Sequence, residues 1–172
     1  MTFYSFVPSP VGELLVAGTP GETAIEVEVL TLPGQRRAPD PRWRHEPGEL
    51  APVAAQIREY FAGDRREFDL TYRVRGTELQ RRVWTILDTI PYGTTTSYGV
   101  LTERLGLPRS AVRAVGAAIG ANPVLLLRPC HRVVGADGSL VGYAGGLDAK
   151  LTLLTHEGAR QPQLPFGEAG PA

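Results

Sequence analysis

The strongest candidate for covalent chemistry in this chain is the stretch Pro129-Cys130-His131-Arg132. Cys130 is the only cysteine, so it forms no internal disulfide and cannot supply the several thiolates of a usual structural zinc site. Its thiol is therefore either inert core filling or a reactive nucleophile. Composition alone favours the inert thiol, whereas the residues around it favour the nucleophile.

Composition sets broad limits. The chain has 172 residues, 42% of them hydrophobic, enough for the core of one large domain or of two small ones. Its formal net charge of zero argues against binding of polyanions by bulk electrostatics. Residues 1–20 lack the pattern of a secretory signal, and no segment stays apolar for the ~18 residues of a membrane span. A lone cysteine fits a reducing compartment, so we expect a cytoplasmic protein with no membrane partner.

The first part of the chain predicts a small antiparallel sheet packed by one helix. Ile25, Val27 and Val29 alternate with glutamates, which is the period of a strand with one wet face. Three strands are predicted, at 3–7, 13–17 and 24–30. Residues 33–48 are rich in Pro, Arg and Gly without an apolar period, which indicates a mobile loop. Helical spacing then predicts a helix over 50–61, with Gly63 at the position of a left-handed cap.

The second part is predicted to be mostly helical. Thr77 and Gln80 have the spacing of a capping box, and the helix that they open ends at Pro91-Tyr92-Gly93. Helices at about 97–105 and 109–119 flank a tight turn at 106–108, which is typical of a helix-turn-helix. A plain helical hairpin with a crowded packing face fits the same pattern.

These elements predict an α+β fold. We expect an N-terminal sheet-and-helix domain over residues 1–75 and a mostly helical domain with the helix-turn-helix over residues 76–158. Residues 159–172 would form a tail, which we expect to be flexible.

Several spaced motifs extend the pattern around the cysteine. They are Glu59-Tyr60-Phe61-Ala62-Gly63, Pro91-Tyr92-Gly93-Thr94-Thr95-Thr96-Ser97-Tyr98, Arg113-Ala114-Val115-Gly116, the run 122–133, Gly142-Tyr143-Ala144-Gly145-Gly146 and His156-Glu157-Gly158. In this order the motifs resemble those of the O6-alkylguanine-DNA alkyltransferases, also called methylated-DNA-protein-cysteine methyltransferases. The resemblance covers most of residues 50–158.

The resemblance implies repair of DNA by direct transfer of an alkyl group. The thiolate of Cys130 would attack the carbon on guanine O6 and keep it as a thioether, so each molecule would react once and need no cofactor. His131 would act as the base through a bound water, and Glu157 would orient and stabilise its imidazolium. A histidine bonded only to backbone is the alternative for His131.

The same resemblance assigns the substrate pocket. Asn122 would hold the active-site turn, although it could also cap a helix, and Tyr98 would donate toward guanine N3, although it could be a packing tyrosine. The remaining pocket residues would supply backbone groups and walls to the base, and they are Val133, Tyr143, Ala144 and Gly145.

The implied partner is double-stranded DNA that carries O6-alkylguanine, and we expect the protein to be a monomer in solution. Because O6 of a stacked guanine cannot reach a buried cysteine, the nucleotide would be flipped out of the duplex. Arg113 would enter the stack in its place, although an ordinary surface salt bridge is the alternative for this side chain. Small residues would let the same helix lie against the minor groove, namely Ala114, Gly116 and Ala117.

Two positions depart from the family pattern. Arg128 and Leu125 stand where relatives usually have an aliphatic residue and a proline, and we expect Arg128 to face solvent rather than the thiolate. His45 is the only histidine of the first part, which has no cysteine, so the zinc site of some relatives cannot form and we expect no metal.

Two other functions fit parts of the pattern. A lesion sensor without transfer activity would resemble the alkyltransferase-like proteins, but those have another residue in place of Cys130. A cysteine hydrolase would need an oxyanion loop, which is not evident, and a base less awkwardly placed than the adjacent His131.

Overall fold

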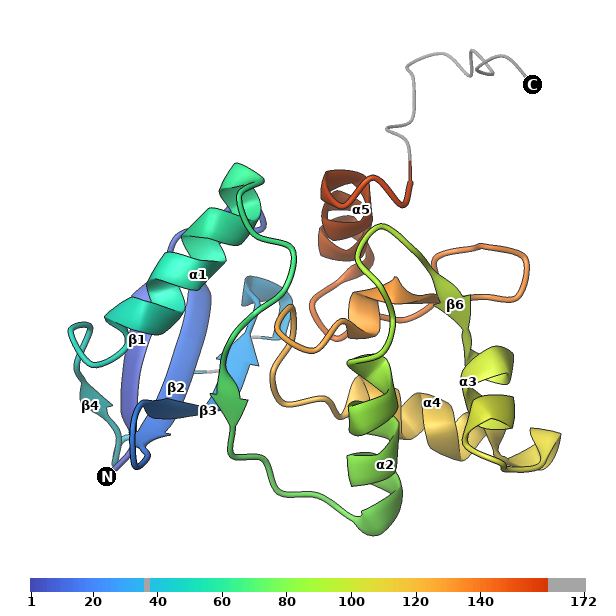
Figure 1. The fold of residues 1–172 in the computed structure, drawn as a ribbon, viewed down its shortest axis with the longest axis horizontal. Helices are drawn as coiled ribbons and strands as arrows, with labels where there is room; N and C mark the ends of the chain where they lie inside the picture. Colours follow the sequence, from blue (N-terminus) through green and yellow to red (C-terminus); the bar gives the residue numbers. More distant parts are fainter. Residues whose placement is uncertain (36–37, 161–172) are drawn as a thin grey trace.

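The computed structural model describes residues 1–35 and 38–160 (Figure 1). Its N-terminal part contains a sheet of strand order β4-β1-β2-β3-β5. The strands are β1 (Phe3–Val7), β2 (Leu14–Pro20), β3 (Ile25–Thr31), β4 (Arg44–His45) and β5 (Thr71–Tyr72). The three predicted strands are thus confirmed, each within a few residues of its expected bounds.

The expected antiparallel pairing is confirmed for β1, β2 and β3 but is wrong for the two edges. β4 runs parallel to β1, and β5 runs parallel to β3. Each edge strand has two residues and reaches the sheet after a long connection, which allows parallel pairing. The stretch expected to be a loop therefore contains β4 and a one-turn 3-10 helix, Pro33–Gln35. Such short pieces leave no periodic signal in a sequence.

Helix α1 (Ala51–Ala62) covers the sheet in Figure 1 and ends as expected. Gly63 adopts a φ of 84°, the left-handed conformation that glycine tolerates best, and its N–H bonds to the last turn of the helix. The buried face of α1 consists of Val53, Ala54, Ile57 and Tyr60.

Within residues 76–160, the C-terminal part contains four α-helices: α2 (Glu78–Leu87), α3 (Tyr98–Arg104), α4 (Val112–Gly120) and α5 (Leu147–His156). The capping box of α2 is confirmed, since Thr77 accepts from Gln80 N and the Gln80 side chain accepts from Thr77 N. The helix-turn-helix is present, but residues 109–111 form a 3-10 turn before α4 begins. The sequence analysis did not predict α5.

The two parts of the chain share one continuous core. Leu30 of β3 bonds to the main chain of Pro123 and Leu125 on either side of an isolated bridge to Val124. Apolar side chains of β3 and α1 belong to the same buried cluster as those of the C-terminal helices. A second sheet, β6 (Thr96–Ser97) paired in parallel with β7 (Val133–Val134), places the segment after the cysteine beside the start of α3. None of the helices in the described part is long and apolar enough to cross a membrane.

Candidate active site

Cys130 is held by a tight turn between α4 and β7. Cys130 is the first residue of a 3-10 turn, Cys130–Arg132, that leads directly into β7. Leu126, four residues earlier, has a φ of 70°, the only positive φ outside glycine in residues 1–35 and 38–160. Such a conformation costs ~1–3 kcal/mol and is tolerated where the surrounding structure enforces it.

Asn122 fixes this turn with all of its polar atoms. Its Nδ2 donates to the carbonyl of Arg128 over 3.1 Å and to Cys130 Sγ over 3.3 Å, while Oδ1 accepts from Val124 N over 3.1 Å. The side chain is 3% exposed. Asn122 therefore connects the end of α4 to the cysteine sulfur.

The resting thiol is protonated. Burial raises the pKa of Cys130 to about 11, although the hydrogen bond from Asn122 and the charge of Lys150 act in the opposite direction. Because only the thiolate is strongly nucleophilic, the site needs a base that removes this proton.

Glu157, the residue after α5, lies behind His131. Its Oε2 meets His131 Nε2 at 2.9 Å, and Arg132 donates from Nε to Oε1 over 2.7 Å and from Nη2 to Oε2 over 2.9 Å. Burial alone would raise the pKa of Glu157, but the hydrogen bonds from Arg132 and His131 outweigh it and lower the pKa to about 2. The carboxylate is therefore ionised and can only accept hydrogen bonds.

This pairing sets the tautomer of His131. The neutral form is favoured because burial lowers the pKa of His131, against the opposing effect of Glu157. Since Glu157 only accepts, the proton of the neutral ring is on Nε2, which leaves the lone pair of Nδ1 free. Nδ1 is buried and has no hydrogen-bond partner among the described residues. It is the basic atom that remains available.

A small cavity of about 130 Å³ opens at the sulfur. It is lined by Tyr98, Gly116, Ile119, Gly120, Cys130, Gly142, Tyr143 and Ala144. The Tyr98 hydroxyl donates to the Val141 carbonyl over 3.0 Å, and the buried Tyr143 hydroxyl has no partner within the described part of the chain. The structure thus brings together Cys130, α4 and the loop over 141–146, with Gly145 buried in that loop.

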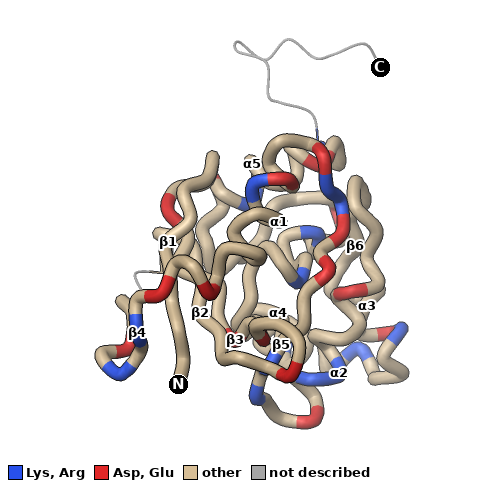
Figure 2. The backbone as a smooth tube through the Cα atoms, turned by 60° about the vertical axis from the view of Figure 1, so that its left-hand side comes forward, with Lys and Arg blue, Asp and Glu red and all other residues tan. Residues whose placement is uncertain are grey.

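Helix α4 presents an exposed face of small residues beside this cavity. Arg113, Ala114 and Ala117 are exposed and Gly116 is half-buried, while Val115, Ala118 and Ile119 face the core. Arg113 forms no ion pair with any residue that the structure describes. Basic segments gather along α2 and beside α3 in Figure 2, and residues 76–122 contain five arginines against three acidic residues. The face around α4 is therefore accessible and mildly basic.

Comparison with known proteins decides the family. The sequence model described as "6-O-methylguanine DNA methyltransferase, DNA binding domain" matches residues 78–159, and the one described as "6-O-methylguanine DNA methyltransferase, ribonuclease-like domain" matches residues 2–73. The chain belongs to the 6-O-methylguanine DNA methyltransferase family. It is thus a DNA-repair transferase whose alkyl acceptor is a protein cysteine, as the sequence resemblance implied.

Individual relatives agree with this membership. A methylated-DNA--protein-cysteine methyltransferase of Mycolicibacterium paratuberculosis is 46% identical over 94% of this chain and 96% of its own length. One from Methanosarcina acetivorans is 39% identical over 91% of this chain and 99% of its own length. The crystal structure of Mycobacterium tuberculosis OGT in complex with DNA matches with a TM-score of 0.81 and 41% identity, over 93% of this chain and 95% of that one.

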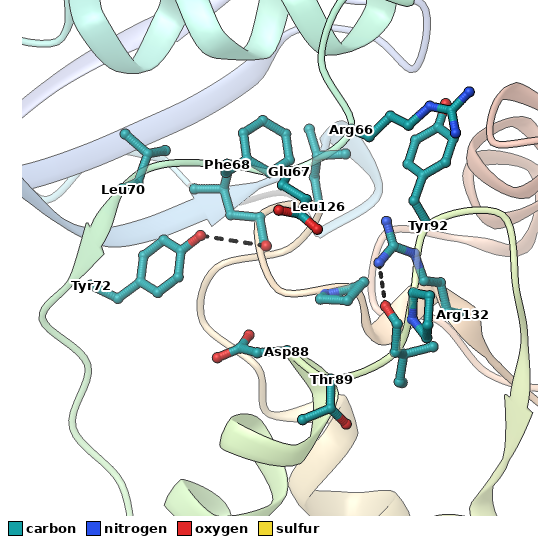
Figure 3. Close-up of a pocket in the computed structure, with 14 residues that line it drawn as sticks. Arg66, Glu67, Phe68, Leu70, Tyr72, Asp88, Thr89, Tyr92, Leu126 and Arg132 are labelled. Atoms are coloured by element: carbon teal, nitrogen blue, oxygen red, sulfur yellow. Dashed lines mark hydrogen bonds between the residues drawn. The ribbon is translucent and has the colours of Figure 1, made fainter.

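The prediction that Arg128 of this methyltransferase faces solvent is wrong. Its side chain is 13% exposed, its Nε lies 3.3 Å from Asp88 Oδ1, and its guanidinium lies 5.2 Å from the centre of the Tyr72 ring. Asp88 and Tyr72 line a cleft of about 490 Å³ between β5 and α2, shown in Figure 3. The carboxylate and the aromatic ring stabilise the cation there, so it faces neither open solvent nor the thiol.

The sequence analysis missed three polar residues of the site. Arg132 bonds to Glu157 and to the carbonyl of Ile90, and Tyr60 donates to Glu157 from α1. Lys150 is fully buried, and its Nζ donates to the carbonyls of Val133, Val141 and Gly142. The one available signal for Lys150 was its place on the buried face of α5, and it could be used only once α5 itself had been predicted. The described residues hold no cluster of three His, Cys, Asp or Glu side chains suited to a metal.

Proposed function

We propose that this protein repairs O6-alkylguanine in double-stranded DNA by moving the alkyl group irreversibly to Cys130. The observation that carries the proposal is a lone cysteine at the floor of a cavity beside the exposed face of α4, with a free basic nitrogen on the next residue. The thioether formed is not cleaved by cellular thiols, so each molecule acts once.

Proton transfer precedes or accompanies the attack. The Cys130 proton passes through a water molecule to His131 Nδ1, and the imidazolium formed is stabilised by Glu157. The sulfur lone pair then forms a bond to the alkyl carbon while the carbon–O6 bond breaks and leaves its electron pair on guanine. The Tyr98 hydroxyl donates a hydrogen bond toward guanine N3, which stabilises the negative charge on the departing base until solvent protonates it. This role requires the Tyr98 hydroxyl to exchange its present bond to the Val141 carbonyl for one to the base.

The surrounding residues position the base and the sulfur. Asn122 holds the turn that presents Cys130, which its three hydrogen bonds support. The carbonyls of Cys130 and Val133 would accept from the exocyclic amine of guanine, and the Val133 oxygen keeps one lone pair for this while it accepts from Lys150. The Ala144 amide would donate to O6, and Tyr143 and Gly145 would complete the wall of the pocket.

DNA would be engaged through α4. Flipping a nucleotide costs a few kcal/mol, less for a lesion that pairs badly, and Arg113 would fill the space left in the stack. Its exposure and its freedom from ion pairs among the described residues support this role. Ala114, Gly116 and Ala117 would allow close approach to the minor groove.

We extend the proposal to the organisation of the protein. Residues 1–75 would form an N-terminal domain and residues 76–158 the domain for DNA binding and transfer, acting together as a cytoplasmic monomer without cofactor or metal. The division between the two matching family models, after residue 73 and before residue 78, supports this boundary. The proposed tail at 159–172 lies outside the described residues except for 159 and 160.

Intact mass measurement tests the proposal. The protein is incubated with duplex DNA that contains one O6-methylguanine, and a gain of one methyl group per chain is expected, on Cys130 by peptide mapping. Cys130→Ser should bind the same DNA without any gain in mass. Binding by the natural protein without a mass gain would instead support a lesion sensor, and a product without lasting modification of the protein would support a hydrolase.

A further inference from the structure

Tyr60 reaches the active site from the other part of the chain. It belongs to α1 and lies 97 residues before Glu157, yet its hydroxyl donates to Glu157 Oε2 over 2.7 Å. The side chain is 0% exposed. Burial, and then the charge of Glu157, raise the pKa of Tyr60, so the phenol stays protonated and remains a donor.

The acceptor atom of Tyr60 is also the acceptor atom of His131. Glu157 Oε2 accepts from Tyr60 Oη, His131 Nε2 and Arg132 Nη2, whereas Oε1 accepts only from Arg132 Nε among the described residues. Hydrogen bonds to one oxygen share its negative charge, so each donor weakens the others. The Tyr60 hydroxyl therefore limits how strongly Glu157 stabilises a charged His131.

The tyrosine is rigidly placed for this contact. His156 Nε2 donates to the Tyr60 carbonyl over 2.8 Å, which ties α1 to α5. The Tyr60 ring packs against Phe61, Phe68 and Tyr92 at centroid distances of 4.9, 5.4 and 6.2 Å. A donor held by this much packing fixes the position of the carboxylate rather than following it.

We propose that Tyr60 is a positioning residue for alkyl transfer, through which α1 orients Glu157 and tunes the basicity of His131. The inference rests on the function proposed above for Cys130 and His131. Without the hydroxyl, more of the charge on Oε2 is available to His131 and the carboxylate loses one of its fixed donors. The added charge raises the pKa of His131, so protonation of His131 blocks transfer up to a higher pH. The loss of a fixed donor leaves Glu157 and His131 less firmly placed, which makes transfer slower above that pH.

Other charged and titratable groups also face this network, and the Tyr60 variant leaves all of them in place. From the elements packed around Glu157 and His131 they are Tyr92, Cys130, Arg132, Tyr143, Lys150 and His156.

Tyr60→Phe removes the hydroxyl and keeps the ring. Tyr92→Phe is the matched control, because its hydroxyl meets the carbonyl of His156 at 3.5 Å and not Glu157. Single-turnover methyl transfer from O6-methylguanine DNA is followed by intact mass over a range of pH. The amplitude gives the fraction of folded, active protein, and the rate constant reports the chemistry, so partial unfolding does not obscure the result.

For Tyr60→Phe we expect a rate constant about ten-fold lower, as for loss of a hydrogen bond to a charged group, and an acid limb moved to higher pH. DNA affinity and the Tyr92→Phe profile should match the unaltered protein. An unshifted acid limb in Tyr60→Phe, or the same change in Tyr92→Phe, overturns the inference. Failure of the unaltered protein to gain a methyl group would instead overturn the proposed function itself.

Discussion

Lys150 is a buried side chain outside the cavity wall that holds the main chain near the reacting sulfur. A buried ammonium group is costly unless all of its protons are bonded. Here Nζ donates to the carbonyls of Val133, Val141 and Gly142 over 2.5, 3.1 and 3.0 Å. Burial lowers the pKa of Lys150 to about 8, although the nearby Cys130 acts against this shift. The lysine thus joins β7 to the loop that closes the cavity.

Replacement of this lysine should slow transfer without weakening DNA binding. Lys150→Met keeps a long apolar stem but removes all three hydrogen bonds to β7 and the loop. We therefore expect the rate of transfer to fall by about ten-fold or more. Single-turnover mass measurement gives the rate, and fluorescence anisotropy gives the affinity for duplex DNA. Arg160→Met is the control, since its guanidinium bonds to Gly138 outside the lysine-bound part of the loop. A wild-type rate in Lys150→Met would contradict the anchoring role.

At the scale of elements, the sequence predicted those helix ends whose signal lies within a few neighbouring residues. The Gly63 cap and the capping box at Thr77 predicted the end of α1 and the start of α2, because caps depend on neighbouring residues alone. The parallel edges β4 and β5 could not be predicted, since each depends on a strand far away in the chain.

The same distinction holds for the site. Cys130, His131 and Glu157 were found through their motifs, and the structure brings the two latter side chains within hydrogen-bond distance. Tyr60 and Lys150 were missed because their polar partners are a carboxylate 97 residues away and three main-chain carbonyls. Neither kind of partner leaves a spacing pattern in the sequence.

The segment Leu32–Gly34 supports the active-site loop from behind. A Cβ on Gly34 would lie 2.8 Å from the Gly145 carbonyl oxygen, closer than real Cβ contacts allow, and 3.1 Å from its carbon, which is tighter than most. Gly34→Ala should therefore displace the loop at Gly145 and slow methyl transfer several-fold, measured by single-turnover mass spectrometry. Gly48→Ala is the matched control, since no described atom lies within 4 Å of its added Cβ. Equal rates in the two variants would show that the loop tolerates the displacement.

A variant in helix α4 should separate DNA binding from the alkyl-transfer step. Arg113→Ala removes the exposed side chain proposed to fill the stack, so we expect slower transfer from O6-methylguanine in duplex DNA. Transfer from a free O6-alkylguanine base should be unchanged, because no flipping is needed. Arg58→Ala removes another exposed arginine, on α1, and should leave both reactions unaltered. A parallel loss with the free base would place Arg113 in the chemistry instead.

At the scale of the whole molecule, the two parts of the chain meet at the buried charges of the site. Tyr60 of α1, Arg132 and His131 all bond to Glu157, within a core continuous from the sheet to α5. Removing one partner of such a group leaves a buried charge unpaired, which costs about 3–5 kcal/mol. Ionisation at the active site and global stability are therefore coupled.

This coupling predicts a loss of stability in acid. The pKa of Glu157, about 2 in the folded protein, lies below the ~4.3 of an unfolded glutamate, so its contribution is complete above pH ~4.3 and is lost as pH falls toward 2. The pKa of His131 is also lowered, so the unfolded chain binds its proton more readily and stability begins to fall below pH ~6.5. Thermal unfolding should thus show Tm falling from about pH 6.5 downward and falling more steeply below about pH 4.3.

Two variants assign the parts of this acid transition. His131→Asn should remove the decline that begins near pH ~6.5 and leave the steeper loss below pH ~4.3. Asp40→Asn is the control for the carboxylate: its hydrogen bond with Arg42 lowers the pKa of Asp40 to about 2 as well, but that pair lies on the surface, where water screens it. We expect no change in the acid limb from Asp40→Asn, because only a buried carboxylate loses a large interaction on protonation. If the steep loss below pH ~4.3 moved in Asp40→Asn, surface charge and not the active-site network would govern acid stability.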